Sequence, residues 1–487
     1  GPLGGVQPGF TIYDESDQER VAKAALELCQ VHETLLTPSR ALWAISAAKN
    51  QLLTPALLAD RAATFEQRTA ARVYAAYEQL LAARNAVDFD DLLLRVAVVL
   101  RDYPDISERL NVRFRYVLID EYQDTNHAQY LIARYLSQHH RNICATGDPD
   151  QSIYGWRGAD LNNILDFEDD YPDALVVRLE ENYRSTPEIL TVASRLIAGN
   201  RRRKHKDLWT RRPDGAPVHV WEFTEDRDEA ERVAGTIVAG HRAGRPYRDF
   251  AIVYRVNALS RGLEDALRAA GVPYRIARGV EFYNRKEIKD TLAYLRVLVN
   301  PADEIALLRC INTPPRGIGD TTIQRLRLSA ADGRTTLLEA VRAAGANPRV
   351  KTAARKLAAF VALLDQLQAA ATGGVAEAVS AVLRHAGLER ALAETDESQG
   401  EDRLANVREL VSAARAYEED VAEPTLEDFL QRISLTSDQD AIDETADAVL
   451  LLTLHAAKGL EFPVVFLLGL EQGLLPHERS LKVGDIE

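Results

Sequence analysis

The sequence predicts an α/β protein in which a block of helices interrupts a set of parallel strands. Two short apolar runs, RYVLID (115–120) and NICATGD (142–148), each end in acidic residues where a turn is due. This pattern is typical of buried parallel strands with functional groups at their carboxyl ends. Apolar residues at helical spacing fill the first hundred residues and return from about 280 to 445, and strands resume at 448–455 and 462–470. We therefore expect a helical domain inserted into an α/β domain.

The composition is that of a large globular protein. A length of 487 residues suggests roughly three or four domains. The hydrophobic share of 46% and the charged share of 27% exclude collagen-like, coiled-coil and disordered classes. The best candidate for a membrane span, PVVFLLGL (463–470), has only the length of a strand, so no membrane association is expected.

Net charge and cysteine content bear on nucleic-acid binding and on the redox compartment of the protein. The chain has 59 Lys and Arg against 73 Asp and Glu, a net charge of −14. This argues against nucleic acid coating the whole surface but leaves local basic patches open. Cys29, Cys144 and Cys310 lie far apart and have no metal-binding spacing, which indicates a reducing, cytoplasmic setting. Because the chain has no methionine and opens on GPLGGVQPGF, we expect it to be a fragment.

The remaining elements follow from local pattern. An exposed acidic link is expected at TDESQGED (395–402), inside the helical block. Helices are expected at 19–29, 42–50 and 71–85, and further strands at 174–180, 217–223, 250–255 and 274–278.

The segment YVLIDEYQDTN (116–126) carries the sharpest local signal. An apolar strand places Asp120 and Glu121 side by side at its exposed end. A carboxylate there can hold Mg²⁺, which prefers oxygen ligands and keeps part of its hydration shell. The neighbouring carboxylate can orient and deprotonate a water for attack on a γ-phosphate. A simple acidic turn is the ordinary alternative for a bare Asp-Glu pair, and the extension YQD makes the segment less generic.

The segment GDPDQSIYGWRGAD (147–160) begins where the next predicted strand ends. Gln151 can hydrogen-bond a phosphate or its attacking water. Tyr154 and Trp156 are two residues apart, a spacing that puts both rings on one side of an extended segment, where unstacked bases can lie. Arg157 beside them suits a phosphate. Burial of both rings in a core is the alternative, and the surrounding polar residues and glycines argue against it.

Two later segments add polar groups next to predicted strands and helices. In LEENYRSTPEIL (179–190) a helix start leaves Tyr183 and Arg184 just before it, where an aromatic ring can stack on a purine and an arginine can neutralise a phosphoryl group. A structural Tyr-Arg pair is the ordinary alternative.

In LTLHAAKGLEFPVV (452–465) a strand ends near His455, a turn carries Lys458, and Glu461 precedes another strand. A lone interior histidine is the ordinary alternative. The neighbouring Lys-Gly turn instead favours contacts to phosphate or ribose.

Together these four segments resemble motifs II, III, IV and V of the UvrD/PcrA/Rep family of superfamily 1 DNA helicases. The resemblance covers essentially the whole chain. Four more segments resemble the family in its order and near its spacing: VDFDDLL (87–93), YRVNALSR (254–261), GVEFYNRKEIKD (279–290) and PPRGIGDTT (314–322). YRVNALSR departs from the family by having Val256 and Leu259 where Thr and Gln are common, so contacts there are less secure.

The resemblance implies an α/β fold of two RecA-like parallel-sheet motor domains, the first incomplete, each with a helical inserted domain. It implies that residues 1–92 are mainly the first insertion and 93–178 the remainder of the first motor domain. Residues 179–278 plus 448–487 would form the second motor domain, also incomplete, and 279–447 its helical insertion.

The resemblance also implies roles for individual residues. For ATP and Mg²⁺, Asp120 holds the metal, Glu121 activates water, Gln151 senses the γ-phosphate, Arg184 reaches it, Tyr183 stacks on adenine and Glu461 contacts ribose. For DNA, the single-strand track is lined by Tyr154, Trp156, Arg157, Arg255, Asn257 and His455, with Lys458 as a further contact. Gly317, Gly319 and Thr321, at a helix start, would meet duplex phosphate, and RRRKHK (201–206) is either a further duplex contact or a solvated surface.

Two of the family's motifs are missing. No GxxxxGK[ST] phosphate loop occurs in the 487 residues, and no RxxYVxxTRA-like motif VI. The family places the first upstream of the opening helices and the second just beyond the last strand. The sequence therefore predicts a truncated chain that has little or no ATPase activity alone.

The resemblance implies an ATP-dependent 3′→5′ DNA helicase or translocase with a part in DNA repair. Its partners would be single-stranded DNA, single-strand/duplex junctions and repair proteins. The alternative is an ATPase-dead nucleic-acid-binding module derived from such a helicase. A metal nuclease using the acids of DFDD (88–91) is a weaker reading, because acidic residues are favoured at a helix start anyway.

Overall fold

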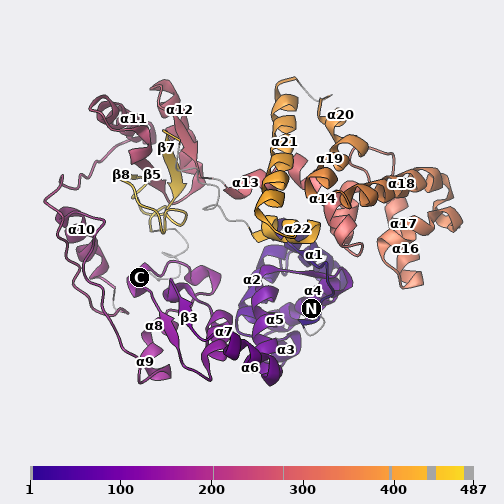
Figure 1. The fold of residues 1–487 in the computed structure, drawn as a ribbon, viewed down its shortest axis with the longest axis horizontal. Helices are drawn as coiled ribbons and strands as arrows, with labels where there is room; N and C mark the ends of the chain where they lie inside the picture. The colour runs from indigo at the N-terminus through magenta and orange to yellow at the C-terminus, as the bar shows by residue number, and fades with distance from the viewer. Residues whose placement is uncertain (1–3, 201, 278, 394–396, 436–445, 477–487) are drawn as a thin grey trace. The chain divides into compact units, whose positions relative to one another are not determined.

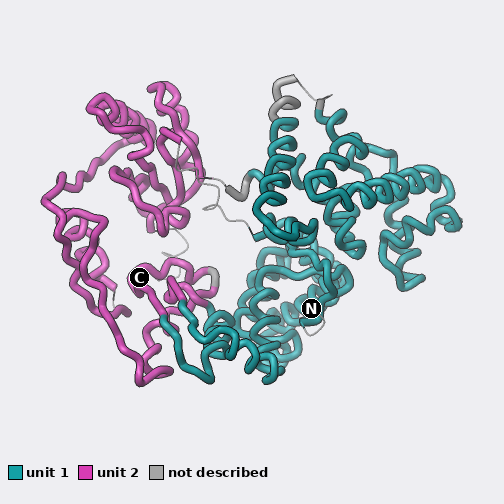
Figure 2. The backbone as a smooth tube through the Cα atoms, viewed as in Figure 1, with its two compact units in different colours: residues 1–118, 126–144, 281–436 teal, residues 119–125, 145–280, 437–487 magenta. Residues whose placement is uncertain are grey.

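The computed structural model describes residues 4–200, 202–277, 279–393, 397–435 and 446–476. These residues fall into two compact units, whose elements are labelled in Figure 1 and which are coloured separately in Figure 2. Unit 1 comprises residues 1–118, 126–144 and 281–436, and unit 2 comprises residues 119–125, 145–280 and 437–487. Segments far apart in the sequence therefore share a unit.

The N-terminal part of unit 1 is helical because its segments carry strong start signals. The Thr64 hydroxyl accepts a hydrogen bond from the Gln67 backbone N–H, and the Gln67 side chain accepts one from the Thr64 backbone. Thr37 and Thr54 cap two helices that open with proline. The helices predicted at 19–29, 42–50 and 71–85 are confirmed with shifted ends. The elements are β1 (Thr11–Ile12), α1 (Glu15–Leu28), α2 (Pro38–Asn50), α3 (Pro55–Arg61), α4 (Phe65–Ala83), β2 (Ala86–Val87), α5 (Phe89–Asp102), α6 (Pro104–Arg113) and α7 (His127–Ser137).

The C-terminal part of unit 1 is a second group of helices with its own apolar core. Tyr294, Leu326, Phe360 and Leu410 are among the buried side chains of this core. The helical block predicted at about 280–445 is confirmed over its described residues. Its helices are α14 (Lys286–Val299), α15 (Glu304–Cys310), α16 (Asp320–Gly333), α17 (Leu337–Arg342), α18 (Ala354–Ala371), α19 (Val375–His385), α20 (Leu388–Ala393), α21 (Glu397–Asp420) and α22 (Leu426–Leu435).

Buried polar contacts join the two parts of unit 1. The Asn300 side-chain amide donates to Thr11 Oγ1 and to the Arg84 carbonyl, each at 2.9 Å. The Arg296 guanidinium lies 2.9 Å from an Asp17 carboxylate oxygen. All of these groups are largely shielded from water, so each hydrogen bond satisfies a group that would otherwise be costly to bury.

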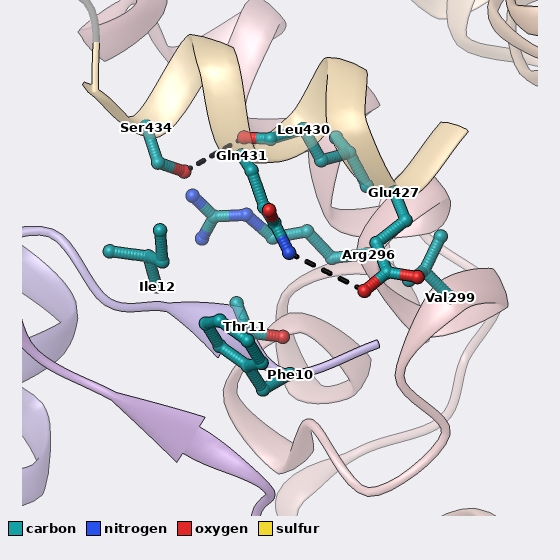
Figure 3. A pocket seen from close by; sticks show the side chains of 9 residues that line it. All are labelled: Phe10, Thr11, Ile12, Arg296, Val299, Glu427, Leu430, Gln431 and Ser434. Atoms are coloured by element: carbon teal, nitrogen blue, oxygen red, sulfur yellow. Dashed lines mark hydrogen bonds between the residues drawn. The ribbon is translucent and has the colours of Figure 1, made fainter. Parts of the chain in front are cut away.

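Helix α22 also contacts strand β1. The Gly9 backbone N–H donates to Glu427 Oε1 at 2.8 Å. Figure 3 shows the small cavity between β1, Arg296 and α22. At about 20 Å³ it has room for roughly one water, so it is a packing gap and not a ligand site.

Unit 2 contains a four-stranded parallel sheet with the order β6-β7-β5-β8. The strands predicted at 250–255, 274–278, 448–455 and 462–470 are confirmed as β5 (Phe250–Tyr254), β6 (Tyr274–Ile276), β7 (Val449–Thr453) and β8 (Val464–Leu467). Strand β7 lies between β6 and β5, so the helical block interrupts the sequence of a single sheet. The apolar core beside this sheet includes Ile237 of α11 (Asp226–Arg242) and Leu267 of α12 (Ser260–Ala269).

A second, two-stranded sheet is made of β3 (Val117–Ile119) and β4 (Ile143–Ala145). These are the strands predicted at 115–120 and 142–148, and they are confirmed. The backbone N–H of Thr146 donates to the Ile119 carbonyl at 2.8 Å, which brings the segments after the two strands together. The other helices outside unit 1 are α8 (Asn162–Leu165), α9 (Phe167–Asp170) and α10 (Pro187–Ile197), and α13 (Gly279–Asn284) crosses the boundary between the units.

Two predicted strands and a predicted link are wrong. Residues 174–180 and 217–223 are not strands. Their apolar side chains are not buried in a sheet either, since Leu175 and Val220 are each 88% exposed. A strand requires hydrogen bonds from a neighbouring strand, and no described strand pairs with either segment. The acidic stretch 395–402 is helical from Glu397, the first residue of α21, and its first two residues lie outside the described part.

Candidate active site and nucleic-acid interface

Three acidic residues follow strand β3, and we call Asp120, Glu121 and Asp124 the β3 acids. Asp120 Oδ1 accepts the Glu121 backbone N–H at 2.9 Å. Glu121 has φ 51° and ψ 42°, a left-handed conformation that is strained for a residue with a side chain. A 3₁₀ turn over Tyr122–Asp124 follows directly. The strained backbone at Glu121 is the kind of feature that a fold keeps where a side chain must point in a required direction.

The buried side chain of Gln123 fixes two of the β3 acids. Its amide nitrogen donates to Glu121 Oε2 at 2.5 Å and lies 3.3 Å from Asp124 Oδ2. Its amide oxygen accepts the Asp148 backbone N–H at 2.9 Å. The Gln123 side chain therefore ties the acids after β3 to the loop after β4. Sequence reasoning assigned it no role, and its position between two acids was the only signal.

Close packing explains the glycine that opens the loop after β4. A Cβ at Gly147 would lie 2.5 Å from Gln123 Oε1 and 2.8 Å from Ile164 Cδ1. In the same loop, the Gln151 side chain donates to Asp148 Oδ2 at 2.8 Å. Gln151 is thus held near the β3 acids through Asp148 and Gln123.

Lys458, from the loop after β7, reaches the same acids. Its ammonium forms an ion pair with Asp124 Oδ2 and lies 3.3 Å from Glu121 Oε2. It also donates to the Gln151 carbonyl at 3.0 Å. Burial works to lower the pKa of Lys458, but Asp124 and Glu121 outweigh it, and the net effect raises the pKa. The contact of Lys458 with DNA stays a prediction; the structure pairs its side chain with carboxylates.

The predicted aromatic residues gather around His455. The ring centroids of Tyr154 and Trp156 lie 6.1 Å and 5.9 Å from that of His455, and the Trp156 ring meets it edge to face. The Tyr154 hydroxyl donates to the His455 carbonyl at 3.3 Å. Trp156 is 61% exposed, so it is not a core residue. We call Tyr154, Trp156 and His455 the aromatic group.

The predicted nucleotide contacts of the later segments also come together. The Arg184 guanidinium forms an ion pair with Glu461, and both side chains are more than half exposed. Tyr183 is 76% exposed, and its hydroxyl donates to Glu181 at 3.1 Å. The ring face of Tyr183 is therefore open to solvent, as stacking on a base requires.

The other predicted DNA contacts are more scattered. Arg255 and Asn257 follow strand β5 in unit 2, and Asn257 is exposed. Arg157 lies in a short 3₁₀ turn, and its side chain is outside the described part of the structure. Three residues of the basic run form ion pairs within unit 2: Lys206 with Asp148, Arg203 with Asp150 and Lys204 with Glu168.

The predicted duplex contact lies in unit 1. Gly319 is the residue before α16, and the exposed Thr321 lies in its first turn. Gly317 has φ 68°, and its carbonyl accepts a hydrogen bond from Lys356 Nζ at 3.0 Å. A lysine thus lies beside this helix start, and the sequence did not indicate it.

The acids of DFDD serve a structural purpose. The Asp88 side chain caps α5 and accepts the Asp91 backbone N–H at 2.8 Å. Lys49 is fully buried, and its ammonium lies 2.8 Å from Asp88, 2.9 Å from Asp91 and 2.7 Å from Glu78. Because a buried ammonium already pairs with these three acids, the arrangement disfavours the metal-nuclease interpretation.

The β3 acids fit a magnesium ion that is bound together with a nucleotide. Among the described residues, no group of three His, Cys, Asp or Glu side chains is arranged to hold a metal. Mg²⁺ in phosphate-transfer sites needs only one or two carboxylates, because phosphates and waters complete its shell. Asp124 Oδ1 is buried with no hydrogen-bond partner in the described part of the chain, so it is an unused acceptor at the site. Among those same residues, no helix is long and apolar enough to cross a membrane.

Parallel strands with helices between them in the sequence define the class of this protein as α/β. Comparison with known proteins gives the family. The UvrD/REP helicase N-terminal domain matches residues 2–172, and the UvrD-like helicase C-terminal domain matches residues 177–487. The chain belongs to the UvrD-like helicase family. The family and the sheets confirm the expected fold with RecA-like motor domains.

Individual relatives agree with this assignment. Over 484 residues the chain is 40% identical to the ATP-dependent DNA helicase PcrA of Staphylococcus aureus and 39% identical to that of Staphylococcus epidermidis. Each match covers 99% of this chain and 66% of the relative, so the chain spans about two thirds of the length of these curated relatives.

Proposed function

We propose that the protein carrying this chain is an ATP-dependent DNA helicase that moves 3′→5′ along single-stranded DNA. The observation that carries the proposal is the joint placement of two groups on the same two loops. The loops after β4 and β7 supply the aromatic group. Lys458 of the loop after β7 contacts the β3 acids and also donates to the Gln151 carbonyl of the loop after β4. A base-stacking surface and a phosphate-hydrolysing site built on shared loops can be coupled mechanically.

In the ATP site we propose these roles. Asp120 holds Mg²⁺, which when bound neutralises charge on the phosphates. Glu121 orients the attacking water and accepts its proton, and Gln151 contacts the γ-phosphate. Arg184 reaches the same phosphate, and its pairing with Glu461 supports a place for the ribose beside it.

On DNA we propose that bases stack on the aromatic group and that neighbouring polar residues contact the strand. Trp156 supplies an exposed ring, and stacking suits every base because each has a π-face. Closure of the two motor domains on ATP would shift the stacked strand by a short step. The proposed DNA contacts are Tyr154, Trp156, Arg157, Arg255, Asn257 and His455 with single strands, and Gly317, Gly319 and Thr321 with duplex at the junction. In the ATP site, Tyr183 is proposed to stack on the adenine of the nucleotide.

For the domain organisation we propose residues 1–92 as mainly the first helical insertion and 93–178 as part of the first motor domain. Residues 179–278 plus 448–487 belong to the second motor domain and 279–447 to its insertion. The sheet order supports this, because β7 returns to lie between β5 and β6. A role in DNA repair, with repair proteins as partners, is proposed from the family resemblance, and a cytoplasmic location from the three widely separated cysteines.

The test measures ATP hydrolysis and strand displacement by the full-length gene product. We expect ATP turnover that single-stranded DNA stimulates, and unwinding of duplexes with a 3′ tail but not a 5′ tail. A chain of residues 1–487 alone should hydrolyse little or no ATP, because it lacks a phosphate loop. DNA binding without any ATP turnover by the full-length product would instead favour the ATPase-dead binding module.

A further inference from the structure

The side chain of Lys458 is largely buried among protein acceptors, whereas a lysine that binds DNA phosphate needs an ammonium open to the DNA. Its side chain is only 11% exposed. An ammonium has three N–H donors, and three acceptors surround this one: Asp124, Glu121 and the Gln151 carbonyl. The ammonium also lies 5.5 Å from the centroid of the Tyr154 ring. Its donors are therefore directed to the β3 acids and the loop after β4.

The carboxylates of Glu121 and Asp124, which pair with Lys458, are also held by the Gln123 side chain. The Gln123 amide donates to the same Glu121 oxygen, Oε2, that Lys458 approaches. Gln123 is fully buried and anchored to the Asp148 backbone. Displacement of Lys458 would therefore remove one of two groups that hold Glu121 Oε2 and would leave the hydrogen bond from Gln123 in place.

A short hydrogen-bonded turn connects Lys458 to His455 of the aromatic group. Lys458 follows His455 by three residues, within a turn in which the Ala457 N–H donates to the Thr453 carbonyl at 2.9 Å and the Ala456 N–H to Thr453 Oγ1 at 3.2 Å. A strand that displaces His455 from Tyr154 and Trp156 would shift this turn and Lys458 with it.

We propose that Lys458 is a positioning residue that transmits occupancy of the aromatic group to Glu121 and Asp124, and that it is not a ligand of DNA phosphate. The inference deepens the proposed function and rests on it for the role of Glu121. Since coupling between two sites is reciprocal, Lys458 links DNA engagement to the orientation of the hydrolytic acid and the reverse.

The first experiment needs no ATP hydrolysis and uses the chain of residues 1–487. Affinity for a fluorescent oligonucleotide is measured at several salt concentrations for wild type, Lys458→Met and Arg157→Ala. Losing one phosphate contact on a single strand lowers the slope of log affinity against log salt by about 0.7. We expect that loss for Arg157→Ala and an unchanged slope for Lys458→Met, with affinity within about twofold of wild type. A slope lowered by about 0.7 in Lys458→Met would overturn the proposal.

A double-mutant cycle tests the ion pair between Lys458 and Asp124, and its melting temperatures also reveal any variant that fails to fold. Melting temperatures are compared for Lys458→Met, Asp124→Asn and the double variant. If the ammonium pairs with Asp124, the double variant should lose less than the sum of the two single losses. Strictly additive losses would contradict the pairing.

The second experiment measures ATP turnover by the full-length gene product at saturating DNA. We expect Lys458→Met to lower kcat and the stimulation by DNA about tenfold with little change in KM for ATP, and Lys458→Arg to recover much of the loss. Full DNA stimulation in Lys458→Met would overturn the coupling. A wild-type protein without any ATPase activity would refute the proposed function and the coupling role together, while the salt slope and the cycle would still judge the contact.

Discussion

Replacing Trp156 with alanine separates a base-stacking role from a structural one. If a base stacks on this ring, the substitution removes about 1–3 kcal/mol of binding, which is about one to two decades in affinity for single-stranded DNA. The loss should be similar for all base sequences and should persist at raised salt, because stacking releases no counterions.

The structure limits how much folding stability the same substitution can cost. Trp156 is 61% exposed. Of the ~200 Å² that a tryptophan can bury, only about 80 Å² is covered, which at ~25 cal/mol per Å² is worth at most about 2 kcal/mol. A tryptophan in a core would cost ~3–5 kcal/mol on truncation to alanine. A large loss of affinity with a small loss of stability is therefore the expected combination.

The assay is fluorescence anisotropy with oligonucleotides at several salt concentrations, together with a denaturant melt. Trp43→Ala is a matched control, because Trp43 is 72% exposed and lies in α2 of unit 1. We expect it to leave single-strand affinity unchanged. Unchanged affinity in Trp156→Ala with a large loss of stability would refute the reasoning.

Three further predictions concern pH, packing and the duplex contact. Burial favours a higher pKa for Asp14, but hydrogen bonds from neighbouring side chains outweigh it and lower the pKa from 3.8 to about 2. This carboxylate should therefore stabilise the fold by about 2 kcal/mol above pH 4, and the advantage over Asp14→Asn in unfolding free energy should vanish as the pH falls to 2. Gly147→Ala should cost ~1–3 kcal/mol in a denaturant melt because its Cβ would clash with Gln123, whereas Gly155→Ala, whose Cβ meets no described atom within 4 Å, should cost less than 1 kcal/mol; equal costs would contradict the packing. At Gly319 an added Cβ meets no described atom within 4 Å and φ is an ordinary −88°, so Gly319→Leu should weaken binding to a duplex junction while sparing short single strands, and equal losses on both would contradict the duplex assignment.

The sequence was sufficient to predict the elements whose pairing or packing is local. Strands β3, β4, β5, β7 and β8 were predicted because their apolar runs are short and end at acids or turns. The segments 174–180 and 217–223 have the same composition but form no strands. The composition of a segment shows that it is able to form a strand. Whether a partner strand lies beside it is known only from the three-dimensional structure.

The candidate site was predictable in its residues but not in its contacts. Sequence patterns singled out Glu121, Gln151 and His455 because their side chains suit phosphate and base chemistry. The bridge through Gln123 and the pairing of Lys458 with Asp124 were not predictable, since they join segments up to 334 residues apart. The position of Lys458 near His455 in a loop predicts a phosphate ligand, and this interpretation changes only when Asp124 and Glu121 are seen beside the ammonium.

The central claim is that Glu121 is the general base of a DNA-driven ATPase, and Glu121→Gln in the full-length gene product tests it most directly. We expect ATP binding to remain nearly intact, DNA-stimulated turnover to fall by about 10²–10⁴-fold, and unwinding to disappear. Glu231→Gln, at an exposed position on α11, is the control and should keep full activity. Unwinding at the normal rate by Glu121→Gln would contradict the claim.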